Sequence, residues 1–437
     1  MHGQYAGKNM TVRFYIKNFG CRLNQHEGDI IGERLLDSGW VRADWRESDV
    51  VIVNGCTVTA RADQKVRQFV HRVRRENPAA KILITGCTAS ALLKHLIRFD
   101  EEVIVVPPRF RYAIPQFLKS GGGHSDEDIP PEEIRTDGQF VLTEGRGISR
   151  TRANLKIQDG CDRRCAYCIV PIVRGGAVSR PAEDVIEQAK KFESAGFKEI
   201  VLTGVDIGTW RDGDLTLASL LRLLLERTEV YRFRLSSIEP PGLTEDLLEL
   251  LAAEPRLAPH LHIPIQSGSQ RLLRDMNRPF YRIADLVKKF ERLRSARADF
   301  CFGTDIIVGF PTETEQDFEQ TRRLLGEGVF AYAHIFRYSP RPGTAAYSLK
   351  PLPAGEVSRR AKILGEIDAH NRVEFARKFV GRQLEFLVER RAGDYLLGRA
   401  ANFLRVKARG VARRNQIATV QIHSAEPMTV IGEVVEL

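Results

Sequence analysis

The alternation of apolar and polar stretches over the first hundred residues predicts a small parallel α/β domain. The predicted strands are residues 11–20, 49–54, 81–85 and 103–106. Residues 24–38 and 60–75 lie between strands and repeat their apolar positions at helical spacing. Strands that alternate with helices favour a parallel sheet, in which the carboxyl ends of the strands share one edge.

The same alternation resumes at residue 152 and continues to about residue 349. The predicted strands there are residues 153–157, 199–203, 233–237, 260–265, 303–308 and 331–336. Helical segments such as 182–195 and 314–326 fall between them. Six strand–helix units predict a partial TIM-like barrel, whose chemistry is expected at the carboxyl ends of its strands.

The end of the chain changes character. A helical pattern rich in Arg, Lys and Glu covers residues 354–380 and ends at Gly381. Short alternating stretches follow at residues 383–389, 395–399, 404–406, 417–422 and 430–435. Short strands separated by turns predict a small β-barrel.

These patterns predict an α/β fold class with three folded parts. The expected domains are a parallel α/β domain over residues 11–120, a (β/α) barrel with a trailing helix over 148–380, and a small β-barrel over 381–437. Residues 121–147 are predicted to be a linker, because glycine, proline and acidic residues occur there without periodicity.

Composition narrows the class of protein. No apolar run approaches the length of about 18 residues that a membrane helix needs, and the polar first ten residues do not resemble a signal peptide. Seven cysteines in a chain without an export signal favour a reducing cytoplasm and metal or catalytic roles over disulfides. The formal charge of +10, from 66 basic and 56 acidic residues, favours an anionic partner such as RNA.

Three cysteines, Cys161, Cys165 and Cys168, lie within eight residues, directly after a predicted strand that Asp159-Gly160 ends. Three thiolates on one short loop can bind three corners of an iron–sulfur cube and leave one iron open for chemistry. The alternatives are a zinc knuckle or three buried thiols. Structural zinc requires four ligands, usually in paired units, and no fourth Cys or His follows nearby, so we expect the cluster.

Three further cysteines, Cys21, Cys56 and Cys87, each follow a glycine at the end of a predicted strand. Parallel strands end at one edge of the sheet, so we expect these distant cysteines to meet and to form a second three-ligand cluster site. The alternative is three separate core cysteines, because free cysteine is often buried. Cys301 lies outside both groups and is expected to be a buried thiol.

Polar residues and glycines follow the predicted barrel strands. They are Thr203, Gly204, Glu239, Gln266, Asp305, Gly309 and Glu313. Each one alone is weak evidence for a site, because residues at the top of a barrel are also often structural.

Basic residues gather in two places that RNA could contact. In the predicted β-barrel, one hairpin without acidic residues carries Arg405, Lys407, Arg409, Arg413 and Arg414. The helix predicted over residues 60–75 carries Arg61, Lys65, Arg67, Arg72, Arg74 and Arg75. The alternative for the hairpin is a solvated charged edge that prevents strand pairing.

The spacing of Cys161, Cys165 and Cys168 resembles the cluster motif of the radical S-adenosylmethionine (SAM) enzymes. The resemblance implies that these three cysteines are the catalytic [4Fe–4S] ligands, that SAM chelates the open iron, and that Tyr167 packs over the cluster. The cofactor-binding residues that it implies are Tyr167, Thr203, Gly204, Glu239, Gln266 and Gly309.

Three amino-terminal motifs narrow the resemblance to the methylthiotransferases. They are Gly20-Cys21-Arg-Leu-Asn24-Gln25, Asn54-Gly55-Cys56-Thr-Val-Thr59 and Thr85-Gly86-Cys87. Gly55 and Thr88 depart from the residues usual in that family, and neither change touches a ligand. The polar residues at the strand ends, taken together, resemble the family's pattern. The final β-barrel is similar in its position along the chain to the family's TRAM domain, which helps bind tRNA. The resemblance thus covers the chain from about residue 11 to residue 437.

The resemblance implies a tRNA-modifying enzyme with two [4Fe–4S] clusters, of which the one on Cys21, Cys56 and Cys87 presents or donates sulfur. One SAM methylates that sulfur. A second SAM yields the radical that removes an unreactive hydrogen from the substrate, chemistry that acid–base side chains cannot perform. The resemblance also implies an external low-potential electron donor such as flavodoxin or ferredoxin, and no membrane.

The family has branches that act on isopentenyladenosine in tRNA, on threonylcarbamoyladenosine in tRNA and on an aspartate of a ribosomal protein. The motifs around Cys21, Cys56 and Cys161 look most like the threonylcarbamoyladenosine branch. We therefore expect the target to be that adenosine, beside the anticodon. The alternatives are a protein side chain as substrate, and a metal-bearing RNA-binding module without turnover.

Overall fold

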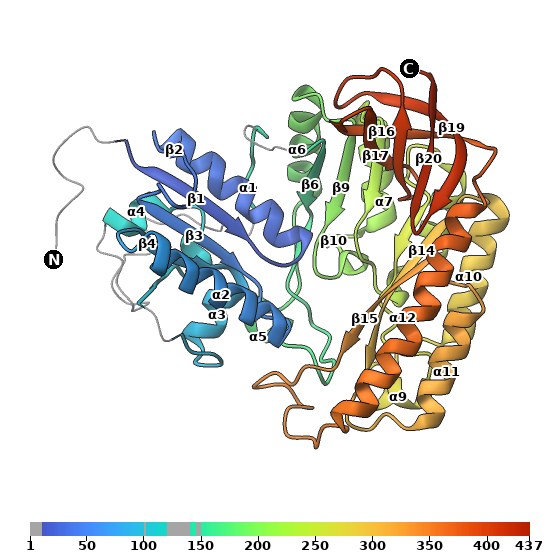
Figure 1. Cartoon of the computed structure of the whole chain (residues 1–437), viewed down its shortest axis with the longest axis horizontal. Coiled ribbons are helices and arrows are strands. Elements are labelled where there is room, and N and C mark those ends of the chain that lie inside the picture. Colours follow the sequence, from blue (N-terminus) through green and yellow to red (C-terminus); the bar gives the residue numbers. More distant parts are fainter. Residues whose placement is uncertain (1–10, 100–101, 120–139, 146–149) are drawn as a thin grey trace.

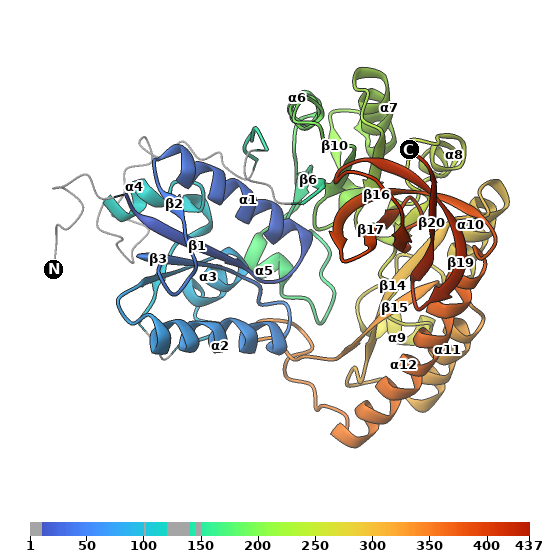
Figure 2. The same ribbon diagram turned by 45° about the horizontal axis from the view of Figure 1, so that its top comes forward.

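The computed structural model describes residues 11–99, 102–119, 140–145 and 150–437. Three parts follow one another along the chain and pack against each other (Figure 1, Figure 2). Much of the predicted linker, residues 121–139 and 146–147, lies outside the described residues. No helix in the described ranges is long and apolar enough to cross a membrane.

The amino-terminal part is a parallel sheet with the strand order β2-β1-β3-β4-β5. Its strands are β1 (Arg13–Asn18), β2 (Val41–Arg42), β3 (Val50–Gly55), β4 (Lys81–Thr85) and β5 (Ile104–Val105). Its helices are α1 (Arg22–Asp37), α2 (Ala60–Glu76), α3 (Gly86–Leu93) and α4 (Ile114–Lys119). Alternation along β3 builds both apolar layers: Val50 and Ile52 pack in the core with α1 and α4, whereas Val51 and Val53 pack in the core with α2.

The central part is an open barrel of parallel strands. They are β6 (Arg152–Lys156), β9 (Glu199–Thr203), β12 (Arg232–Leu235), β13 (His260–His262), β14 (Cys301–Val308) and β15 (Tyr332–Arg337). They pair as β12-β9-β6 and β13-β14-β15, and a bridge between Ser237 and His262 joins the two groups. Among the described residues β6 and β15 do not pair, so the barrel is open between them. β13 ends before the predicted residue 265, because Pro264 lacks the N–H that a strand ladder needs.

Helices cover the outside of this barrel. They are α6 (Ala182–Ser194), α7 (Leu217–Arg227), α8 (Glu245–Ala253), α10 (Ile283–Ala296), α11 (Glu315–Gly326) and α12 (Ala354–Arg377). Leu155, Leu202 and Phe233 join these helices in the main apolar core. Because side chains alternate along a strand, their neighbours Lys156 and Arg234 face the inside of the barrel.

The carboxyl-terminal part is a closed barrel with the strand order β16-β17-β18-β20-β19. Its strands are β16 (Gln383–Ala392), β17 (Tyr395–Ala400), β18 (Arg405–Arg409), β19 (Ile417–Glu426) and β20 (Thr429–Glu436). Phe375 and Phe379, at the end of α12, are part of its core. Phe403 stacks on His260, at the start of β13, with 4.1 Å between the ring centroids. The small barrel therefore closes the end of the central barrel at which the strands begin.

A buried ion network joins the amino-terminal part to the central one. The Glu27 carboxylate of α1 accepts hydrogen bonds from Arg174 at 3.0 Å and from Lys156 at 3.2 Å, and it pairs with Arg111. Asp159 binds the same Arg174 and Lys156, at 2.9 and 2.6 Å. Burial alone would raise the pKa of Glu27, but the three cations hold it well below its ordinary value of 4.5.

The variant Glu27→Gln should destabilise the protein, because three buried cations would then share one carboxylate. Removing one partner of a buried ion pair costs about 3–5 kcal/mol in the free energy of unfolding. Urea denaturation followed by circular dichroism measures this cost, with the exposed Glu47→Gln as the matched control. Since the pKa of Glu27 is depressed in the folded state, its contribution should be complete above pH 4.5 and decline as the pH falls toward the folded pKa. Equal stability of the two variants would contradict this role.

Candidate active site

The central triad consists of Cys161, Cys165 and Cys168. It lies on the loop between β7 (Gln158–Asp159) and α5 (Val170–Arg174). Backbone hydrogen bonds hold this loop from two sides: the Ala166 N–H donates to Met276 at 2.9 Å, and the Ala346 N–H donates to Ala166 at 2.8 Å. Segments far apart in the sequence therefore position the three thiols.

The central triad has the chemistry of a metal-cluster site. Burial raises the pKa of Cys161 to about 11 and that of Cys168 to about 12, and neighbouring thiols add to both shifts. Such thiols stay protonated at neutral pH unless a metal replaces the proton. In the described part of the chain, the one group whose three ligand atoms all lie within 4.8 Å of one another is His262, Asp305 and His334. Neither cysteine triad meets this single-ion criterion, and a multi-iron cluster does not require it, because each thiolate binds its own iron.

The amino-terminal triad consists of Cys21, Cys56 and Cys87. The first is the exposed N-cap of α1, the second follows β3, and the third lies in the first turn of α3. A bridge between Gly55 and Gly86 joins the ends of β3 and β4. Burial and the two other thiols raise the pKa of Cys56 to about 12. The structure thus brings the three distant cysteines together at the expected edge of the sheet.

At Cys87 no loop separates strand from helix, because α3 begins directly after β4. Gly86 has a φ of +75°, in the left-handed region that favours glycine. A Cβ on Gly86 would lie 2.8 Å from the Gly55 carbonyl oxygen. Glycine therefore allows the helix to start directly against β3.

Arg174 of α5 links the two triads. Its Nε donates to Cys87 Sγ at 3.1 Å, and its Nη2 donates to Asn24 Oδ1 at 2.6 Å. Burial raises the pKa of Cys87, and the Arg174 guanidinium opposes that rise. Behind Arg174, the ion network holds three cations against two carboxylates, so its excess positive charge favours an anionic group at Cys87. The sequence assigned no role to Arg174, whose only signal was its place shortly after Cys168.

Gln158 connects the end of β9 to the central triad. Its side chain accepts hydrogen bonds at 2.9 Å from the N–H groups of residues 205 and 206, and it donates to two carbonyl groups at the start of the triad loop. A Cβ on Gly204 would lie 2.9 Å from the Gln158 carbonyl oxygen, so glycine is needed for this close approach. Thr203 is buried at the end of β9. Thr203 and Gly204 were predicted from the sequence as site residues, whereas Gln158 was not.

Glu239 reaches the central triad through Arg278. The Arg278 guanidinium pairs with the Glu239 carboxylate, and its Nη1 donates to Cys165 Sγ at 3.4 Å. Burial raises the pKa of Glu239, although Arg278 opposes the shift. Burial also raises the pKa of Tyr167, again against the charge of Arg278. The structure thus places Glu239 and Tyr167 beside the triad and identifies Arg278, which the sequence did not indicate, as a positioning residue.

Two other predicted residues lie in different surroundings. Gln266 is buried at a φ of +64°, a strained conformation that backbone hydrogen bonds to Asp305 and Ile307 hold in place. Gly309 donates its N–H to Glu313 Oε2 at 2.7 Å, and a Cβ there would lie 2.5 Å from Val357 of α12. Gly309 and Glu313 form a packed corner, and the part of Gly309 in cofactor binding stays a prediction.

The basic residues of the small barrel form two groups, so the prediction of one shared hairpin was wrong. The first group, on the outer face of β18, is Arg405, Lys407 and Arg409. The second group, on the loop that follows, is Arg413 and Arg414. This loop borders a hollow shared with Tyr231 of the central part. No hairpin forms because β20 lies between β18 and β19 in the barrel.

Known proteins resemble this chain over most of its length. The family model described as the radical SAM superfamily matches residues 155–325, and the model described as uncharacterized protein family UPF0004 matches residues 13–107. A threonylcarbamoyladenosine tRNA methylthiotransferase of Rickettsia prowazekii is 35% identical over 401 residues, which cover 91% of each chain. A tRNA-2-methylthio-N6-dimethylallyladenosine synthase of Novosphingobium aromaticivorans is 32% identical over 96% of each chain. A solved radical SAM methyltransferase from Kitasatospora setae shares the fold, with a TM-score of 0.57 and 16% identity over 77% of each chain.

Gly160 determines how the central triad loop begins, and its replacement tests this. It has a φ of +66°, and an added Cβ would lie 1.8 Å from the Gly176 carbonyl oxygen. Gly213 is a matched control, since its φ is +56° and no atom lies within 4 Å of an added Cβ. A residue other than glycine in the left-handed conformation costs about 1–2 kcal/mol, and we expect Gly213→Ala to lower the free energy of unfolding by this amount. We expect Gly160→Ala to lower it by more, because its Cβ would also clash with the Gly176 carbonyl oxygen. Thermal unfolding measures both, and equal losses would show that the Gly176 contact does not hold the loop.

Proposed function

Because the chain belongs to the family of radical SAM tRNA methylthiotransferases, we propose that it adds a methylthio group at position 2 of N6-threonylcarbamoyladenosine, beside the anticodon of tRNA. One observation carries the proposal: two cysteine triads are joined through Arg174, which binds Cys87 and follows Cys168 on the same short segment. An enzyme that used only one cluster would not need the second triad. The threonylcarbamoyladenosine relative, which matches over 91% of both chains, supports the substrate.

We assign the central triad to the [4Fe–4S] cluster of the radical SAM reaction and the amino-terminal triad to a second [4Fe–4S] cluster. When bound, the clusters and SAM supply the electron, the carbon radical and the sulfur that protein side chains cannot supply. The chain itself supplies the six thiols, and Arg278 and Arg174 each donate a hydrogen bond to one sulfur of a triad. The residues assigned to SAM are Tyr167, Thr203, Gly204, Glu239, Gln266 and Gly309.

We also propose that the outer face of β18 binds the tRNA backbone. Arg405 and Arg409 are exposed, and Lys407 lies between them with its Nζ 4.4 Å from the centre of the Tyr395 ring. A row of cations on one strand can follow the phosphates of a loop. The target adenine must be splayed out of the anticodon loop to enter the barrel, at the low cost typical of single-stranded loops. Turnover further requires an external low-potential electron donor, such as flavodoxin or ferredoxin.

Loss of single cysteines tests the two cluster assignments. The anaerobically reconstituted protein should contain roughly eight iron atoms per chain, four in each cluster. Cys165→Ala and Cys87→Ala should each lose roughly half of this iron, because each removes one of the three ligands of one cluster. Only Cys165→Ala should also abolish the cleavage of SAM to 5′-deoxyadenosine. Cys301→Ala, at a buried thiol outside both triads, is the matched control and should keep its iron. Full iron content in Cys87→Ala would contradict the second cluster.

Nucleoside mass spectrometry of tRNA tests the substrate. Deletion of the gene should remove 2-methylthio-N6-threonylcarbamoyladenosine and leave N6-threonylcarbamoyladenosine in its place. The wild-type gene should restore the modification, and Cys165→Ala should not. Loss of the methylthio group from dimethylallyladenosine instead would assign the substrate named for the Novosphingobium relative.

A further inference from the structure

The inside of the central barrel is unusually polar. A packed (β/α) barrel interior normally carries layers of Val, Ile and Leu. Here the inward positions that alternate with the core residues include Asn154, Lys156, Glu199, Arg234, His260, His262, Asp305, Tyr332 and His334. Contacts between β13 and β15 over the inner face of β14 agree with this orientation, since the Tyr332 hydroxyl lies 2.9 Å from His260 Nε2 and 3.2 Å from His262 Nδ1. Such an interior suits a polar ligand.

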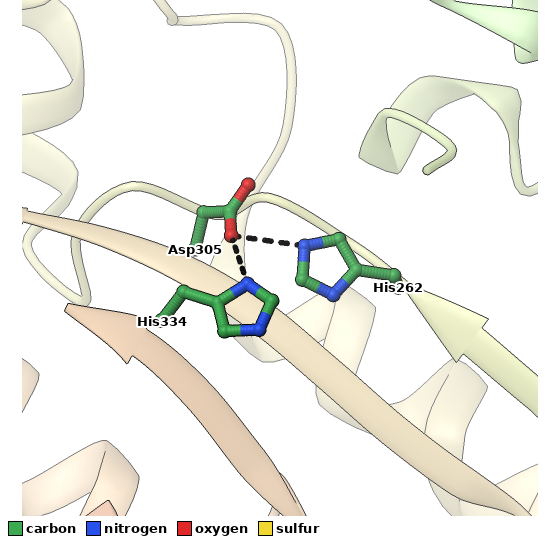
Figure 3. A group of neighbouring side chains, drawn as sticks. All are labelled: His262, Asp305 and His334. Carbon is green, nitrogen blue, oxygen red and sulfur yellow. Dashed lines mark hydrogen bonds and ion pairs between the residues drawn. The ribbon is translucent and has the colours of Figure 1, made fainter. Parts of the chain in front are cut away.

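On the β15 side of the opening, His262, Asp305 and His334 form a hydrogen-bonded group, which we call the histidine–aspartate cluster (Figure 3). His262 Nε2 and His334 Nδ1 both lie 3.0 Å from the same Asp305 oxygen, Oδ1. An ionised carboxylate only accepts hydrogen bonds, so both imidazoles donate to it. The second Asp305 oxygen and the far nitrogen of His334 point away from the cluster, and the His334 side chain is 52% exposed (Figure 3). The cluster therefore keeps one carboxylate oxygen and one imidazole nitrogen for a ligand.

On the β6 side of the opening, Arg22 offers a cation that forms no ion pair with the described residues. It follows Cys21 directly, and its Nη1 is buried without a hydrogen-bond partner among the described residues. The guanidinium lies 5.6 Å from the Phe403 ring, which stacks on Tyr332 with 5.8 Å between centroids. Arg22 also lines a cavity of about 330 Å³ together with the inward-facing Asn154 and with Glu389, whose carboxylate is already paired with Arg152 at 2.9 Å. A buried cation without an acceptor is costly, so this position calls for an anionic partner.

The two substrate classes named by the relatives differ at N6. A threonylcarbamoyl group carries a carboxylate, a hydroxyl and the N–H groups of a urea, whereas a dimethylallyl group is a hydrocarbon. A hydrocarbon would leave Arg22 Nη1 and the second Asp305 oxygen without a hydrogen-bond partner, whereas a threonylcarbamoyl group offers a partner to each. Ring positions 2 and 6 of adenine both flank N1, so a residue next to Cys21 is within reach of the N6 group when position 2 meets the sulfur of the amino-terminal triad.

We propose that the barrel interior is the site that selects the N6 substituent. Arg22 pairs with the carboxylate of the threonylcarbamoyl group, and the histidine–aspartate cluster binds its hydroxyl and N–H groups. These are specificity residues that hold the substrate and do not take part in the transfer itself. The inference rests on the proposed function and adds to it the residues that distinguish the two substrate classes.

The test compares the binding of three anticodon stem-loop RNAs of identical sequence, which carry N6-threonylcarbamoyladenosine, N6-dimethylallyladenosine or plain adenosine. The reconstituted full-length protein should bind the first about tenfold to a hundredfold more tightly than the third, as expected for hydrogen bonds to charged groups. Arg22→Gln and His334→Ala should bring this ratio toward one, and Arg22→Lys should keep part of it. Exposed Arg46→Gln and His370→Ala are the matched controls and should keep the wild-type ratio. Iron content and thermal unfolding of each variant show that it is folded and loaded.

The ratio of binding affinities reports only on the N6 substituent, because the three RNA probes are otherwise identical. Two results would overturn the inference: an affinity ratio near one in the wild-type protein, or an unchanged ratio in Arg22→Gln and His334→Ala. The proposed function would still stand in either case if the protein methylthiolated threonylcarbamoyladenosine. Methylthiolation of the dimethylallyl probe alone would overturn the proposed substrate. Stoichiometric zinc that disappears in His334→Ala would assign the cluster to a metal and overturn its role in substrate binding.

Discussion

The Glu27 carboxylate is the contact on which the geometry of the molecule depends. It is fully buried between Arg111 of its own part of the chain and two cations of the central part, Lys156 and Arg174. A charge in that position is tolerated only while all of its partners are in place. The network therefore holds the amino-terminal sheet at one position against the barrel. Because Arg174 also binds Cys87, the same contact sets how the amino-terminal triad faces the central one.

An apolar contact supports this electrostatic one. Ile169, directly after the last cysteine of the central triad, packs with Val173 against Cys87 and Ala91 of α3. Arg341, from the loop after β15, adds a buried ion pair to Asp63 of α2 at 2.6 Å. Both triads are thus fixed to elements that pack directly on each other. This arrangement suits chemistry in which groups held at two metal sites must meet at one substrate atom, because reacting groups that are pre-positioned avoid a large entropic cost.

The carboxyl-terminal barrel has a structural role in the same site. It closes the amino ends of the central strands, where Phe403 covers His260 and the backbone carbonyls of residues 400 and 401 accept hydrogen bonds from Arg234. The interior is therefore closed at this end and open between β6 and β15. The cavity at the open side is bordered by α1 and Arg22. The domain we propose to bind the tRNA backbone is thus also the floor of the pocket we propose for the modified base.

The sequence by itself determined the α/β class, the main strands of all three parts, the helices α1, α2, α6, α11 and α12, and the two groups of three cysteines, because these depend on local periodicity and on spacing along the chain. It also indicated that the amino-terminal cysteines meet, since parallel strands end at one edge. Only the tertiary structure decided the partners of Arg174, Arg278 and Gln158, and the separation of the basic residues of β18 from Arg413 and Arg414. The buried charges and the polar barrel interior could not be predicted either. A charged residue in a sequence looks the same whether it is solvated or buried, and its ion-pair partners here lie up to 278 residues away, as for Asp63 and Arg341.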